Sequence, residues 1–136
     1  TPLPWTDAPS AGFSTGQPWL PISEEHRARS VALQEHDPAS VLSAFRAFLA
    51  WRRAEPVLLH GDIHFLDSAE PVLLFERTLA DETLLLAFNL SAEPVRHPLP
   101  EGTWQQQPVP GPAGGTAEGG GLLLPGHAVY CARKLG

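Results

Sequence analysis

Proline and glycine interrupt this chain more often than any architecture of long regular elements allows. The 136 residues include fifteen prolines and twelve glycines, and a proline inside a helix removes a hydrogen bond and clashes with the preceding turn. A bundle of long helices is therefore excluded, and short elements joined by many turns are expected. Apolar residues make up 43% of the chain and charged residues 18%, which is typical of a folded domain rather than of a disordered segment.

Charge and cysteine content argue against several classes of function. The net charge is −6, so no basic surface favours a nucleic acid or an anionic membrane as partner. The longest apolar runs are too short to span a bilayer. Cys131 is the only cysteine; it cannot form an internal disulfide, and no Cys/His spacing typical of zinc sites occurs. We therefore expect no metal and no cofactor.

The start of the chain shows no signal peptide, and the chain contains no methionine. A chain that begins at Thr1 without an initiator methionine is expected to be processed or to be cut from a longer protein. We expect a cytoplasmic location and leave a periplasmic one open.

The sequence pattern changes near residues 54–56, from a loop and a helix to short strands. Residues 1–36 show no period and carry aromatic residues among prolines, so they predict a loop packed on something, with an exposed turn at 24–30. Residues 37–53 predict a helix that Asp37 caps and Pro56 ends. Its apolar residues recur at helical spacing and form one stripe, which consists of Val41, Leu42, Phe45, Phe48 and Leu49.

Short strands are expected after Pro56. The candidates are 57–66, 72–78, 83–90, 95–99, 104–109, 122–124 and 128–133, with a hairpin at 80–82 and a mobile glycine-rich loop at 111–121. Six or seven short strands at this spacing predict an antiparallel Greek-key-type β-sandwich, and the fold is mostly β.

Several side chains are candidates for a metal, nucleophile or sugar-binding site, but their surroundings favour structural roles. His60, Asp62 and His64 alternate as ligands on one strand face would, but no further ligand accompanies them, so an exposed polar face is the interpretation. Cys131 lies between apolar neighbours and is expected to be a buried, inert thiol. Trp104 is expected in the core rather than stacked on a sugar.

Carboxylate pairs and a catalytic triad are also considered. Glu24 with Glu25, and Glu70 with Glu76, lack the apolar surroundings that raise a carboxyl pKa for glycoside chemistry. Ser91, His97 and Asp81 show no nucleophile elbow, and the glycine-rich loop lacks the lysine and helix of a phosphate loop. No active site is therefore assembled by these residues.

An ordered set of motifs resembles a known family. The set consists of residues 1–5 (TPLPW), 11–14 (AGFS), 18–21 (PWLP), 37–40 (DPAS), 49–53 (LAWRR), 88–91 (FNLS) and 124–126 (LPG). In this order it resembles the "RTPMPW…AGF…PWLP" region and the following segment of the α-glucosidases of glycoside hydrolase family 13, the α-amylase superfamily. Leu3 replaces the usual Met and Phe45 the common Tyr.

The resemblance implies an architecture. Residues 1–55 would be the end of the catalytic (β/α)₈ barrel, with an active-site-side loop and the last helix, and residues 56–136 would be the C-terminal β-sandwich, or domain C. The barrel of the parent enzyme would then be the partner of this domain. The substrate, an α-glucoside oligosaccharide, would reach it only through the parent.

The resemblance also implies where the chemistry lies. The family uses a retaining mechanism with an Asp nucleophile, a Glu acid/base and a second Asp, all upstream of this segment. No catalytic residue is therefore assigned here, and the chain alone is expected to be inactive. The loop residues Trp5 and Phe13 are the candidates for substrate binding, with Trp5 expected one layer behind the pocket.

Three readings stay open. The parent would hydrolyse terminal α-linked glucose from small oligosaccharides, or it would be a trehalose synthase or a sucrose-active transglycosylase of the same family. Alternatively the β domain is a non-enzymatic carbohydrate-binding module.

Overall fold

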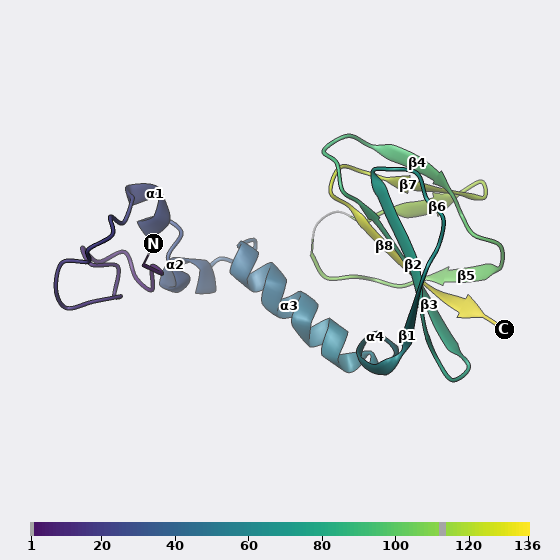
Figure 1. The fold of residues 1–136 in the computed structure, drawn as a ribbon, viewed down its shortest axis with the longest axis horizontal. Coiled ribbons are helices and arrows are strands. Elements are labelled where there is room, and N and C mark those ends of the chain that lie inside the picture. Colours follow the sequence, from purple (N-terminus) through teal and green to yellow (C-terminus); the bar gives the residue numbers. More distant parts are fainter. Residues whose placement is uncertain (1, 112–113) are drawn as a thin grey trace. The chain divides into compact units, whose positions relative to one another are not determined.

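A computed structural model describes residues 2–111 and 114–136 of the chain, and Figure 1 traces their elements. The chain forms two compact units, residues 1–46 and residues 47–136, and each is described by itself. Thr1 of the first sequence motif and residues 112–113 of the expected glycine-rich loop lie outside the described residues. In the described part, no helix has the length and apolar character needed to cross a membrane.

The first unit contains two short helices, α1 (Glu24–Arg27) and α2 (Val31–Glu35). The Ser23 hydroxyl caps α1 by accepting a hydrogen bond from the His26 N–H at 3.2 Å. The expected exposed turn at 24–30 is thus wrong in part, because one helical turn forms there and Ser30 at its end is fully buried. Ser30 is also the residue that precedes the first turn of α2.

Helix α3 (Val41–Ala54) begins four residues after the expected start at Asp37. The Asp37 carboxylate accepts a hydrogen bond from the Ala39 N–H at 2.9 Å, which forms a turn instead of a helix. The Ser40 hydroxyl accepts one from the Ser43 N–H at 3.1 Å, so Ser40 is the N-cap. The apolar stripe of α3 has no buried residue, and Val41 and Phe45 are 81% and 58% exposed.

Helix α4 (Pro56–His60) replaces the first half of the strand expected at 57–66. Pro56 occupies its first turn, where the missing N–H costs nothing. The proline therefore starts a new helix in addition to ending α3. Val57 and Leu58 are buried in the core, which explains why this apolar run resembles a strand in the sequence. Strand β1 (Asp62–Phe65) follows.

The second unit is a sandwich of two antiparallel sheets, which confirms the expected fold class (Figure 1). The larger sheet has the order β1-β2-β3-β8-β5 and the smaller one the order β4-β7-β6. The remaining strands are β2 (Val72–Leu79), β3 (Glu82–Asn89), β4 (Val95–Pro98), β5 (Thr103–Gln106), β6 (Thr116–Glu118), β7 (Gly121–Leu124) and β8 (Val129–Leu135). Their bounds follow the expected strands closely, except that β5 ends at Gln106 rather than at 109.

Strand β6 was not expected, because it lies inside the segment predicted to be a mobile glycine-rich loop. It pairs with β7 through a turn in which Gly119 and Gly120 have φ angles of 58° and 77°. These left-handed angles favour glycine. Gly119 and Gly120 thus form a hairpin turn, and the expected loop is wrong for residues 116–118 and 121, which lie in paired strands.

Each face of the larger sheet contributes to a separate core. One face packs against the smaller sheet, where Leu85, Ala87 and Tyr130 meet Leu122 and Leu124. The opposite face packs against α4 and the end of α3, in a cluster of Val57, Leu58, Leu84, Leu86 and Cys131, flanked by Trp51, Phe75, Leu79, Phe88 and Val109. Because both faces carry apolar side chains, β2, β3 and β8 lack a simple alternation of apolar and polar residues.

Candidate functional site

The loop that holds the first two sequence motifs is built on a left-handed turn. Ala11 and Gly12 have φ angles of 53° and 65°, and the buried Ala11 carbonyl accepts hydrogen bonds from the N–H groups of Trp5 at 2.8 Å and Thr6 at 3.1 Å. The Trp5 carbonyl accepts a further bond from the Ala32 N–H at 2.9 Å. A Cβ on Gly12 would lie 3.0 Å from the Thr6 hydroxyl, so this turn requires glycine for space as well as for φ.

The two substrate-binding candidates, Trp5 and Phe13, occupy different environments in this loop. Both side chains are half exposed, at 50% and 53%. Phe13 lines a shallow hollow of about 380 Å³ together with Pro2, Ser14, Gln17, Pro18, Trp19 and Leu20. Trp5 is not part of that lining, although its backbone anchors the turn. The structure thus does not bring the two side chains into one pocket.

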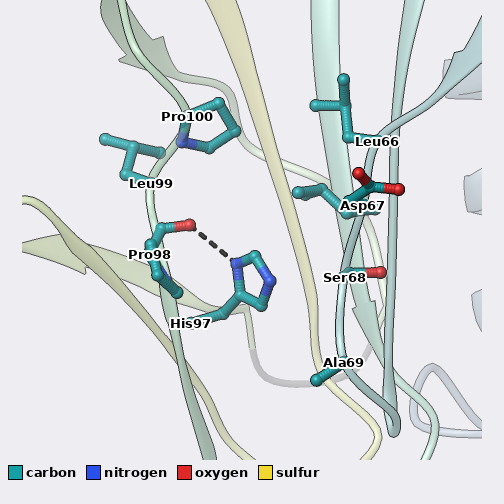
Figure 2. Close-up of a pocket in the computed structure, with 9 residues that line it drawn as sticks. Leu66, Asp67, Ser68, Ala69, His97, Pro98, Leu99 and Pro100 are labelled. Carbon is teal, nitrogen blue, oxygen red and sulfur yellow. Dashed lines mark hydrogen bonds between the residues drawn. The ribbon is translucent and has the colours of Figure 1, made fainter.

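The second unit has a groove of about 580 Å³ at one end of the sandwich. Figure 2 shows its two walls, residues 66–69 on one side and 97–100 on the other. Leu66 and Leu99 also pack against the core between the sheets. The groove is therefore an open margin of the core, with Asp67, Ser68 and His97 as its polar side chains.

Two of these polar side chains are already engaged. The His97 Nδ1 lies 2.7 Å from the Pro98 carbonyl oxygen, so it carries the proton in that contact. The Ser68 hydroxyl donates to the Val72 carbonyl at 2.8 Å and points away from His97 in Figure 2. Since the polar atoms do not converge on one point, the groove lacks the arrangement of a catalytic centre.

The other polar candidates are also dispersed. His60 ends α4, whereas Asp62 and His64 lie on β1, in which all four residues are exposed. The expected exposed polar face is therefore confirmed for Asp62 and His64, whereas His60 lies in a helix and is not part of it. Within residues 2–111 and 114–136, no group of three or more potential ligands is placed to bind a metal ion.

The remaining carboxylates and the Ser–His–Asp combination form no site either. Glu24 and Glu25 are exposed in the first turn of α1. The Ser91 hydroxyl lies 2.9 Å from the Asn89 Oδ1 rather than near a histidine. Asp81 is exposed in the turn between β2 and β3.

Cys131 is an inert thiol, as expected. It is 1% exposed on β8, and burial, with a smaller contribution from Glu55, raises the pKa of its thiol to about 12. A thiol rather than a thiolate is therefore present at neutral pH, and it is a poor nucleophile. Trp104 is half buried against the core, and its Nε1–H donates to the Pro100 carbonyl at 2.9 Å, which agrees with the expected structural role.

One polar residue whose structural role the sequence did not predict joins three segments. Asn89 ends β3 and is 2% exposed. Its Nδ2 lies 2.7 Å from the Glu93 carbonyl, 3.1 Å from that of Leu124 and 3.0 Å from that of Pro125. The sequence feature that could have indicated this role is an Asn in a strand that is otherwise apolar. A polar side chain buried in such a strand is expected to be hydrogen-bonded.

Comparisons with known proteins divide the chain into two parts. Residues 1–61 match a family described as the catalytic domain of alpha amylase. Residues 63–131, half of the chain, match a family described as a domain of unknown function, DUF3459.

Individual relatives agree with these matches. A probable alpha-glucosidase from Rhizobium meliloti (strain 1021) is 46% identical over 74% of this chain and 18% of its own length. An alpha-glucosyl transfer enzyme, XgtA, has a crystal structure that superimposes on this chain with a TM-score of 0.95, and the two sequences are 56% identical. The match covers 99% of this chain and 25% of that one. The trehalulose synthase MutB from Pseudomonas mesoacidophila MX-45 is 31% identical with a TM-score of 0.84, over 98% of this chain and 25% of that one.

The chain thus spans about a fifth to a quarter of the length of these relatives. The sequence motifs, the sandwich that follows four helices and the matches to both families agree with one another. This chain belongs to glycoside hydrolase family 13, the α-amylase superfamily, and its residues 63–131 belong to the DUF3459 domain family.

Proposed function

We propose that the protein to which this chain belongs is a retaining α-glucosidase that removes terminal α-linked glucose from small oligosaccharides. The observation that carries this proposal is the 46% identity to a probable alpha-glucosidase. In this proposal residues 1–55 complete the catalytic barrel and residues 56–136 form domain C, which packs against the barrel and supports it. A cytoplasmic location remains a prediction.

The dispersal of the polar side chains supports a structural role for this segment. None of the candidate combinations among the described residues converges on a point where a glycosidic bond would be cleaved. Retaining cleavage needs two carboxyl groups about 5 Å apart on either side of that bond. We therefore assign both carboxyl groups to the part of the catalytic barrel outside this chain.

The test is hydrolysis of isomaltose by the complete enzyme, followed by NMR of the released glucose. The expected first product is the α-anomer, because two successive displacements retain the configuration at the anomeric carbon. A β-anomer as first product would show an inverting mechanism and contradict the proposal.

A second candidate function is transfer of the α-glucosyl group to another sugar. The 56% identity to an alpha-glucosyl transfer enzyme favours it, and trehalose synthases and sucrose-active transglycosylases are variants of the same reaction. The two functions differ in the acceptor that attacks the covalent glucosyl intermediate, which is water or a sugar hydroxyl. Chromatography of the products at high maltose concentration separates them, because transfer yields longer saccharides and hydrolysis yields glucose.

A further inference from the structure

Residues 2–22 form a long loop without a helix or strand, and hydrogen bonds nevertheless order its middle part. The Phe13 N–H donates to the Ser10 carbonyl at 3.0 Å, and the Ser14 hydroxyl accepts from the Gly16 N–H at 3.1 Å. Loops of this length in a compact domain are uncommon and usually serve in binding or as active-site loops. The segment lies within residues 1–61, which match the alpha-amylase catalytic domain, and the loops that follow barrel strands build barrel active sites.

The hollow of about 380 Å³ in this loop has two exposed aromatic side chains in its lining. Trp19 is 91% exposed and Phe13 is 53% exposed, and large apolar side chains gathered at a surface hollow are typical of an interaction site. The polar side chains of Ser14 and Gln17 also line the hollow and are exposed. An aromatic lining with a few hydrogen-bonding groups is typical of small-ligand sites, and the volume lies within their usual range.

The chemistry of this lining fits a neutral sugar ring. The C–H groups on one face of a pyranose pack against an aromatic ring, whereas its hydroxyl groups need hydrogen-bond partners. The Gln17 amide and the Ser14 hydroxyl can each donate and accept. None of the described residues that line the hollow carries a charge, which disfavours a phosphorylated sugar, because phosphate is usually bound by arginine or lysine. Pro2 and Pro18 in the lining restrict the backbone and so keep the hollow in shape.

We propose that Phe13 and Trp19 form the surface on which the complete enzyme binds the second sugar ring of its substrate. The inference rests on the proposed function, and it adds which residues of this chain contact sugar. The ring that is cleaved off must lie between the two catalytic carboxyl groups, which are assigned to the rest of the barrel, so the ring bound here is its neighbour. The contact falls to Trp19 instead of Trp5, because Trp5 lies outside the lining of the hollow.

The test compares the hydrolysis of isomaltose, which has a second ring, with that of methyl α-glucoside, which has none. In the complete enzyme, Trp19→Ala is expected to raise the KM for isomaltose about tenfold, as the loss of one aromatic contact would. The kcat and KM for methyl α-glucoside should stay unchanged. Trp19→Phe keeps an aromatic face and should recover most of the affinity for isomaltose.

Leu33→Ala is the matched control, because Leu33 is an exposed apolar residue of α2 outside the hollow. It is expected to leave the kinetics of both substrates unchanged. A readout that does not depend on activity is calorimetric titration of the complete enzyme with a sulfur-linked analogue of isomaltose, which resists cleavage. Its Kd should rise about tenfold in Trp19→Ala and stay constant in Leu33→Ala.

An unchanged KM for isomaltose in Trp19→Ala would overturn the inference. Equal losses of kcat/KM for the two substrates, a large fall in melting temperature or a failure to fold would show that Trp19 packs inside the protein, and would also overturn it. If the complete enzyme does not cleave isomaltose but its Trp19→Ala variant binds the analogue tenfold more weakly, the proposed activity alone fails. If the variant cleaves isomaltose with an unchanged KM, the sugar contact alone fails.

Discussion

At the residue scale, Asn89 is a buried polar side chain whose Nδ2 bonds to the carbonyl groups of Glu93, Leu124 and Pro125. Asn89→Ala removes a donor from the carbonyl groups of Leu124 and Pro125, although the Pro125 carbonyl still accepts from the Ala128 N–H at 3.1 Å. It also removes the Oδ1 that accepts from the Ser91 N–H at 3.0 Å. Because unpaired buried polar groups cost about 1–3 kcal/mol each, we expect the free energy of unfolding to fall by about 3 kcal/mol. Urea denaturation followed by tryptophan fluorescence measures the change.

Gln105→Ala is a suitable control for this substitution, since Gln105 is exposed on β5. A loss of stability for Asn89→Ala no larger than for Gln105→Ala would show that the bonds of Asn89 contribute little. Asn89→Asp should be at least as harmful as Asn89→Ala, because it places a carboxylate oxygen against carbonyl oxygens.

The Cys131 thiol gives a pH prediction. Its pKa is raised from about 9 to about 12 in the folded chain, so below pH 9 both the folded and the unfolded chain carry the neutral thiol. Above pH 9 the unfolded chain ionises first, and the contribution of this group to stability therefore falls as the pH rises toward 12. Reaction with a thiol reagent at pH 8 should be slow in the folded chain and fast in urea. Rapid labelling of the folded chain would contradict the burial of Cys131.

Trp5 is expected to behave differently in the chain and in the complete enzyme. Its side chain is 50% exposed here, so Trp5→Ala should cost the 136-residue chain little stability. In the complete enzyme, if Trp5 packs behind the pocket, the same change should cost about 3–5 kcal/mol as a large-to-small core substitution and should lower kcat. An unchanged melting temperature and kcat, with a raised KM alone, would instead identify Trp5 as a direct sugar contact.

The sequence predicts some of these residue roles and not others. The burial of Cys131 follows from its apolar neighbours in the strand, which are local. The role of Asn89 depends on carbonyl groups 35 and 36 residues away, so no local pattern reveals it. The placement of Trp5 and Phe13 depends on two successive left-handed residues, Ala11 and Gly12, and an alanine in that conformation is uncommon.

At the scale of elements, the strands are predicted better than the helices. Strands β2, β3, β7 and β8 are apolar runs bounded by turn residues, and the structure places them close to the expected bounds. The run at 57–60 is equally apolar but forms α4, because Pro56 suits the first turn of a helix. From this helix, the side chains of Val57 and Leu58 pack into the core. A short apolar run does not distinguish these outcomes.

Hydrogen exchange should separate the elements by stability. Amides in 72–90 and 128–133 are expected to exchange slowly, because β2, β3 and β8 are neighbours inside the larger sheet. Amides before residue 37 are expected to exchange quickly, since the helices there are short and have no buried residues of their own. Uniform protection along the whole chain would contradict this and would indicate that the loop packs as firmly as the sandwich.

At the scale of the whole molecule, two kinds of surface favour a supporting role. The stripe of α3 contains no buried residue, and Phe65 and Ile63 on the edge strand β1 are 60% and 47% exposed. Apolar surfaces of this kind need partners, whereas the polar side chains of the groove at 66–69 and 97–100 do not converge. The family match supplies the partner in our proposal, the catalytic domain of the same protein.

The central claim is that this chain supports an α-glucosidase without carrying its catalytic groups, and release of p-nitrophenol from p-nitrophenyl α-glucoside tests it most directly. The complete enzyme is expected to release p-nitrophenol at an ordinary enzymatic rate. The purified 136-residue chain at the same concentration should stay at the uncatalysed background, because loss of the nucleophile and the acid removes many orders of magnitude in rate. Release by the chain alone at a rate near that of the complete enzyme would contradict the claim.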